Sequence, residues 1–245
     1  MLELSISREY LVYTDSSSKG MIPKYYKDGY WYKLNQMGYE SKSEYIISEL
    51  LKASNIKDFV EYQECMVNGR NACVSHDFLH EGEVFKSFKK IYYAYTGLNL
   101  HEDILKYREV ESRISFVIDF FADKLGLDIK EYLQNILWLD CITLNDDRHF
   151  GNLGFIYNTS SGEIRTSPIF DNGSALLSNF STYSIYDSIE DNFSKVVGCP
   201  FSGSLIAQAS YFENPYHFDL SFLEGIVDCR AKSVLVYRLK QLGMK

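Results

Sequence analysis

The chain has 245 residues, which is enough for one large domain or for two lobes around a cleft. Hydrophobic residues make up 46% and charged residues 24%, a balance typical of folded proteins and unlike that of disordered chains. The net charge of −8 disfavours nucleic acid and anionic membranes as partners, because both attract basic surfaces.

The cysteines also restrict the class of protein. They are odd in number, widely spaced and without a C-x-x-C pair: Cys65, Cys73, Cys141, Cys199 and Cys229. This pattern disfavours a disulfide framework or a zinc site. Neither a standard secretory signal peptide nor an apolar run long enough to span a membrane is visible. We therefore expect a cytoplasmic protein, although an effector secreted by another route would have the same features.

Short strands are predicted for the first part of the chain. Residues 10–13 and 30–34 are rich in strand-forming side chains, and the polar residues 14–20 between them predict a loop. Residues 59–78 indicate further strands around a turn at Asn68-Gly69.

One helix interrupts these strands. Residues 41–53 carry apolar side chains at helical spacing. Ser41 and Glu44 fit a capping box, in which the two side chains would satisfy backbone N–H groups at the start of the helix.

Helices are predicted to dominate from Glu83 onward. Helical spacing is clear in residues 109–125 and 130–143, and the last sixty or so residues again favour helices, ending at 233–242. A hairpin interrupts them, with strands at 153–157 and 163–170. The order predicts an α+β, two-lobed fold, with a small β-rich lobe at residues 1–80 and a larger helical lobe at 81–245.

Two motifs flank this hairpin. The sequence reads D-R-H-F-G-N at 147–152 and F-D-N-G at 170–173. The hairpin would bring Asp171 back beside Asp147 and Asn152. Phosphoryl transfer requires a carboxylate facing the attacking hydroxyl, and Mg²⁺ prefers carboxylate and amide oxygens. The spacing therefore predicts that Asp147 faces the attacking hydroxyl and that Asn152 and Asp171 are Mg²⁺ ligands.

Several simpler interpretations remain open at this stage. Asp146 could replace its neighbour Asp147, and Asp171 could belong to an ordinary turn. Arg148 and His149 are candidate catalytic residues, but they could instead brace the loop through a carboxylate pair or a hydrogen bond.

The segment 139–177 resembles the core of HipA-like toxin kinases and, more loosely, that of phosphoinositide lipid kinases. The resemblance implies that Lys33, in Y-K-L, contacts ATP phosphates and that Glu44 is its partner; Glu49 is the alternative partner. Residues 72–78 resemble the interlobe hinge beside the adenine, which implies a nucleotide contact for Ser75 and Asp77.

The loop at 14–20 departs from the usual phosphate-binding pattern, because it has serines and one closing glycine instead of G-x-G-x-x-G. If Ser16, Ser17 and Ser18 lie over ATP, they are candidate sites of autophosphorylation. The chain also lacks room for the additional N-terminal subdomain of HipA toxins.

The resemblance implies a two-lobed, protein-kinase-like fold and an ATP- and Mg²⁺-dependent serine/threonine-protein kinase. It also implies a protein substrate and allows for an antitoxin or regulatory partner. A small-molecule or lipid kinase, a nucleotide-binding pseudokinase and a metal-dependent phosphohydrolase are the alternatives.

Overall fold

The computed structural model describes residues 2–14 and 22–244 of the chain. The strands are β1 (Leu2–Leu4), β2 (Leu11–Thr14), β3 (Ile22–Lys27), β4 (Tyr30–Leu34), β5 (Gln63–Val67), β6 (Arg70–His76), β7 (Glu83–Ser87), β8 (Gly154–Asn158) and β9 (Ile164–Thr166). The α-helices are α1 (Glu40–Lys52), α2 (Phe88–Thr96), α3 (Leu100–Ile104), α4 (Val110–Leu125), α5 (Lys130–Thr143), α6 (Ile189–Phe193), α7 (Leu205–Ala209) and α8 (Arg230–Gln241). Two short 3-10 helices are η1 (Arg8–Tyr10) and η2 (Leu220–Gly225).

The first six strands form one sheet in the order β1-β5-β6-β4-β3-β2. Strand β1 runs parallel to β5, whereas the other neighbours are antiparallel. The predicted turn between β5 and β6 is confirmed: Asn68 and Gly69 both have positive φ, as a two-residue hairpin turn requires.

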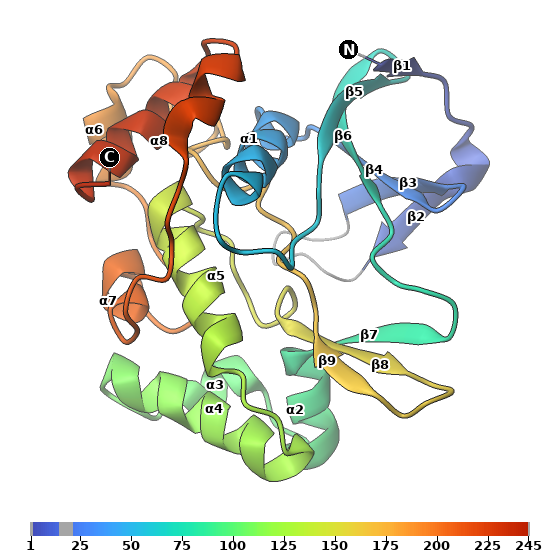
Figure 1. Cartoon of the computed structure of the whole chain (residues 1–245), viewed down its shortest axis with the longest axis vertical. Helices are drawn as coiled ribbons and strands as arrows, with labels where there is room; N and C mark the ends of the chain where they lie inside the picture. The colour runs from blue at the N-terminus through green and yellow to red at the C-terminus, as the bar shows by residue number, and fades with distance from the viewer. Residues whose placement is uncertain (1, 15–21, 245) are drawn as a thin grey trace.

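Helix α1 lies between this sheet and the C-terminal helices (Figure 1). Its buried residues Ile46, Ile47, Leu50 and Leu51 belong to the same continuous apolar cluster as α4, α5 and α8. Since both sides of α1 are packed, a polar side chain on this helix has a fixed position relative to the sheet and to the helical part of the chain.

A second sheet, β7-β8-β9, stands below the first one in Figure 1. Strand β8 directly follows the D-R-H-F-G-N loop. Gly154 at its start is required by packing, because a Cβ there would lie 2.5 Å from the backbone oxygen of Lys86 on β7. The close pairing of β7 and β8 therefore fixes the end of the loop.

Some sequence predictions were wrong in detail. Residues 83–87 form strand β7, although helices were predicted from Glu83, because this segment completes a sheet with the hairpin. The second hairpin strand is limited to Ile164–Thr166. The end of the chain has mainly short helices joined by irregular segments; α8, of 12 residues, is the long one.

The predicted capping box was also wrong. Helix α1 begins at Glu40, one residue before Ser41, and Tyr39 at the N-cap makes no side-chain cap. Glu40 instead accepts hydrogen bonds from the backbone N–H groups of Gln36, Met37 and Gly38.

Within residues 2–14 and 22–244, no helix has both the length and the apolar character needed to cross a membrane.

Candidate active site

The central feature of the site is a lysine between two carboxylates. Lys33 on β4 donates to Glu44 Oε1 at 2.8 Å and to Asp171 Oδ1 at 2.9 Å. It also lies 3.2 Å from the hydroxyl of Tyr62. Burial alone would lower the pKa of Lys33, but Asp171 and Glu44 outweigh burial and raise it well above its usual value. Lys33 is therefore a cation at neutral pH.

Glu44 links the sheet to the F-D-N-G motif. Its second oxygen, Oε2, accepts from the backbone N–H of Asn172 at 2.9 Å. Its side chain is only 2% exposed. The structure thus pairs Lys33 with Glu44, whereas Glu49, the alternative partner, pairs with Lys52.

Asp171 has a constrained backbone, with φ of 62°. Aspartate tolerates this left-handed conformation better than most residues. Burial would raise the pKa of Asp171, but Lys33, Lys24 and Arg148 outweigh it, so the pKa lies well below its ordinary value. Asp171 therefore presents an ionised carboxylate.

Arg148 braces the loop. Its side chain and that of Asp140 on α5 are both 0% exposed and form an ion pair of 3.0 Å. The same guanidinium donates to the backbone oxygen of Phe170 at 2.7 Å and to Asn172 Oδ1 at 2.6 Å. One buried cation thus ties α5, the D-R-H-F-G-N loop and the F-D-N-G motif together. The fully buried guanidinium is held by groups of α5 and of the F-D-N-G motif, an arrangement that supports the bracing role.

Asp146 and Asp147 are directed to different surroundings. The carboxylate of Asp146 accepts a hydrogen bond from the hydroxyl of Tyr183. Asp147 instead lines a small cavity of about 80 Å³ together with Asn152 and Asp171. This arrangement favours Asp147 as the residue that faces a substrate.

Asn152 carries the feature that fits a metal ion. Its Oδ1 atom is buried and has no hydrogen-bond partner in the part of the chain that the structure describes. An unpaired buried amide oxygen is costly unless a ligand completes it. Within the described residues no group of three or more His, Cys, Asp or Glu side chains could hold a metal. The Oδ1 atom of Asn152 and the carboxylate of Asp171 are oxygen donors of the kind that Mg²⁺ takes, in an arrangement in which water and substrate oxygens would supply the remaining ligands.

His149 lies on the same loop. Gly151 N donates to its Nδ1 at 3.0 Å, so the proton of the neutral ring is on Nε2. Burial lowers the pKa of His149. Its Nε2 atom is buried and has no partner among residues 2–14 and 22–244, so the structure shows no group through which it would act.

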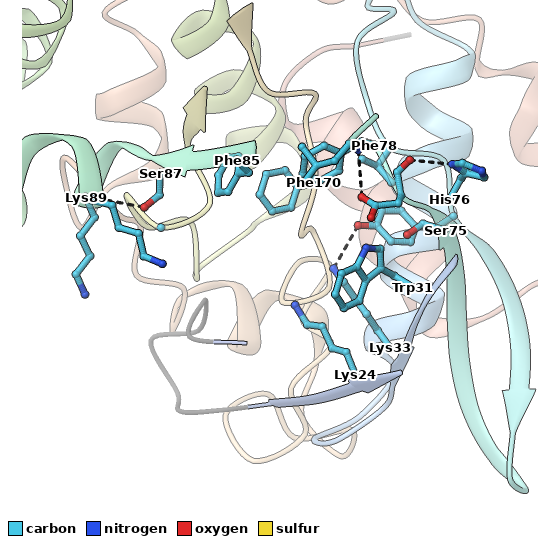
Figure 2. A pocket seen from close by; sticks show the side chains of 16 residues that line it. Lys24, Trp31, Lys33, Ser75, His76, Phe78, Phe85, Ser87, Lys89 and Phe170 are labelled. Carbon is cyan, nitrogen blue, oxygen red and sulfur yellow. Dashed lines mark hydrogen bonds between the residues drawn. The ribbon is translucent and has the colours of Figure 1, made fainter. Parts of the chain in front are cut away.

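A larger cavity of about 570 Å³ adjoins this cluster, and Lys24 and Lys33 line both cavities. Figure 2 shows Phe78, Phe85 and Phe170 grouped along it, with ring centroids 5.2 to 6.1 Å apart. Its size and aromatic lining are typical of a site for a small organic ligand.

The residues that the resemblance places at the hinge lie along the same large cavity. Ser75 at the end of β6 and Asp77 just after it are both lining residues. The carboxylate of Asp77 accepts from Leu79 N at 3.1 Å, and its own N–H donates to Gly29 O, so this segment is firmly held. Ser16, Ser17 and Ser18, the other proposed nucleotide contacts, lie outside the described residues.

Three residues that contribute to the site were not predicted from the sequence. Lys24 on β3 stands directly opposite Lys33 in the sheet register. Asp140 and Tyr62 are the buried partners of Arg148 and Lys33. The only signal for Lys24 was its alternation with neighbouring apolar residues in a segment that contains Pro23, which is unfavourable in strands.

Comparison with known proteins identifies the fold. No protein-family profile and no curated protein sequence matches the chain. Among solved structures, the chain is similar to the Helicobacter pylori proinflammatory kinase CtkA, with a TM-score of 0.52 and 15% identity over 97% of this chain and 82% of that one. A second match is HipA of Shewanella oneidensis MR-1, solved with HipB and operator DNA. The TM-score is 0.45 and the identity 12%, over 95% of this chain and 61% of HipA. The chain therefore has the α+β kinase fold of the H. pylori protein, as the resemblance of residues 139–177 to HipA-like kinases implied.

Proposed function

We propose that this protein transfers the γ-phosphoryl group of ATP to the hydroxyl of a serine or threonine in a protein. The observation that carries the proposal is the convergence of Lys33, Asp147, Asn152 and Asp171 on one small cavity that adjoins a larger aromatic one. The fold shared with a kinase agrees with this chemistry. The lobes would be residues 1–80 and 81–245, with the nucleotide between them.

The two cavities suit the two halves of ATP. The aromatic cavity beside Ser75 and Asp77 would receive the adenine. Lys24 and Lys33, on neighbouring strands, lie where this cavity meets the smaller one and would face the triphosphate. Lys33 is already neutralised by two carboxylates, whereas Lys24 forms no ion pair within the described chain. Lys24 therefore supplies the additional positive charge for the phosphates.

Three residues of the small cavity, Asp147, Asn152 and Asp171, have distinct roles in transfer. Asp147 orients the acceptor hydroxyl and takes its proton. As the acceptor oxygen bonds to the γ-phosphorus, the bond from phosphorus to the β–γ bridging oxygen breaks, and ADP is the leaving group. Asn152 and Asp171 would hold Mg²⁺, which when bound neutralises charge that develops on the phosphate oxygens. Arg148 and Glu44 act as positioning residues, because they hold the backbone around Asp171.

A comparison of neighbouring aspartates tests the proposal. Wild type, Asp147→Asn and Asp146→Asn would be incubated with γ-labelled ATP and Mg²⁺, and label would be measured on the protein and on added protein acceptors. We expect Asp147→Asn to lower the rate by roughly 10²- to 10⁴-fold, the usual effect of losing a catalytic base. Asp146→Asn should retain most activity, because its carboxylate is bonded to Tyr183.

The reaction products distinguish the proposed kinase from the alternative functions. Equal labelling by the two variants would refute the role of Asp147. Release of inorganic phosphate without a labelled acceptor would indicate a phosphohydrolase. Mass spectrometry of the labelled chain would show whether Ser16, Ser17 or Ser18 is modified, as expected for autophosphorylation.

A further inference from the structure

Two lysines outside the proposed triphosphate site also line the large cavity. Lys89 and Lys90 lie in the first turn of α2 and are exposed. Figure 2 shows Ser87 and Lys89 at the end of the cavity opposite Ser75 and His76, and therefore away from the segment that would bind the adenine. Their position is distinct from that of Lys24 and Lys33 on the sheet.

The backbone holds this pair against the catalytic loop. Lys89 N donates to the backbone oxygen of Phe150 at 3.0 Å, and Phe88 N donates to that of Leu153 at 2.8 Å. The hydroxyl of Ser87 caps the helix by accepting from Lys90 N. Phe150 belongs to the same loop as Asp147, so the two lysines have a fixed position relative to the proposed base. Burial lowers the pKa of His149 on this loop, and the charges of Arg148 and Lys89 act in the same direction.

The charges of this pair are not balanced by the protein. In the described parts of the chain, neither Lys89 nor Lys90 forms an ion pair, whereas the exposed lysines Lys52 and Lys195 each contact a carboxylate. The cavity lining includes one acidic side chain, Asp77, which belongs to the opposite end. A cationic site beside the catalytic loop of a chain with net charge −8 would attract an anionic partner.

We infer that Lys89 and Lys90 select a protein acceptor whose target serine or threonine is flanked by acidic side chains. This inference rests on the proposed function, since it assumes that the acceptor hydroxyl approaches Asp147. Each acidic flank would gain a charge-assisted contact at the rim of the cleft, where such contacts affect specificity and association more than total affinity.

The test uses two fluorescein-labelled peptides that differ only in charge. One has a single serine flanked by glutamates, and the other has glutamines at the same positions. Their affinities for the wild-type protein would be measured by fluorescence anisotropy with a non-hydrolysable ATP analogue and Mg²⁺, and their phosphorylation would be measured with ATP. The same measurements would be made on Lys89→Glu/Lys90→Glu and on a control, Lys86→Glu/Lys130→Glu. The control changes the net charge equally at exposed lysines that do not line the cavity.

We expect wild type and the control to bind the glutamate peptide roughly 10-fold more tightly than the glutamine peptide, and the Lys89/Lys90 variant to lose this preference. The KM for ATP should be unchanged. A wild type without the preference, or a variant that weakens ATP binding and keeps peptide selectivity, would overturn the inference. Selective peptide binding without phosphorylation in wild type would contradict the proposed function, while the preference of Lys89 and Lys90 for acidic peptides would stand.

Discussion

The buried pair of Asp140 and Arg148 makes a strong prediction about stability. Asp140→Asn preserves the shape of the side chain but removes the negative charge beside a guanidinium that is 0% exposed. Removing one partner of a buried ion pair costs about 3–5 kcal/mol, because the remaining charge stays desolvated. Whole domains are stable by only about 5–15 kcal/mol, so this is a large fraction of the free energy of unfolding.

Denaturation by guanidinium chloride, followed by the fluorescence of Trp31 and Trp138, would measure this loss. An exposed pair serves as the control: Asp187→Asn, beside Lys195, should cost less than about 1 kcal/mol. If Asp140→Asn also cost less than about 1 kcal/mol, Arg148 would not depend on Asp140 as its buried partner, contrary to the prediction.

A double variant separates stability from positioning. Asp140→Leu with Arg148→Met replaces both charges by apolar side chains, which often restores stability at buried pairs. We expect the free energy of unfolding to recover. Phosphoryl transfer should remain impaired, because no guanidinium then binds the backbone oxygen of Phe170 and the Oδ1 atom of Asn172.

Three further predictions concern the metal, pH and packing. Asn152→Ala should weaken Mg²⁺-dependent nucleotide binding by at least roughly 10-fold in calorimetry and leave metal-free binding unchanged; equal losses in both conditions would argue against a metal ligand. The pKa of Asp171 is lower in the folded protein than the ordinary aspartate pKa of about 4, so ionised Asp171 stabilises the fold above that pH. This contribution to the free energy of unfolding should be lost as the pH falls toward the folded-state pKa. Asp171→Asn should therefore flatten the decline of unfolding free energy between about pH 5 and pH 2, and an unchanged slope would contradict the assignment. Gly38→Ala should destabilise the fold by about 1–3 kcal/mol or more in thermal unfolding, because its Cβ would lie 1.8 Å from the backbone oxygen of Ser178. Gly203→Ala, where the nearest atom is 3.6 Å away, is the control, and equal effects would refute the clash.

Local sequence was sufficient to predict which residues the hairpin brings together in the site. Asp147, Asn152 and Asp171 are close in the chain, and the intervening strands with a turn leave few ways to arrange them. The family resemblance implied Glu44 as the partner of Lys33, but helical periodicity alone did not exclude Glu49, since both lie on one helix. Five residues along a helix turn a side chain to another face, and the structure places Glu44 toward Lys33.

Contacts between distant elements could not be predicted. Asp140 is a single carboxylate in a largely apolar helix, and no sequence motif predicts its ion pair with Arg148. Lys24 becomes part of the site because β3 pairs with β4, a register that depends on the whole sheet. Strand β7 was missed because its few residues run directly into α2, and its pairing with β8 is determined by tertiary structure.

A crystal structure with Mn²⁺ and a non-hydrolysable ATP analogue tests the central claim most directly, because Mn²⁺ can replace Mg²⁺ and is located by its anomalous signal. We predict one peak bonded to Asn152 Oδ1 and to the carboxylate of Asp171, with the triphosphate beside Lys24 and Lys33. A metal or nucleotide bound elsewhere, with Asn152 Oδ1 still unoccupied, would contradict the account.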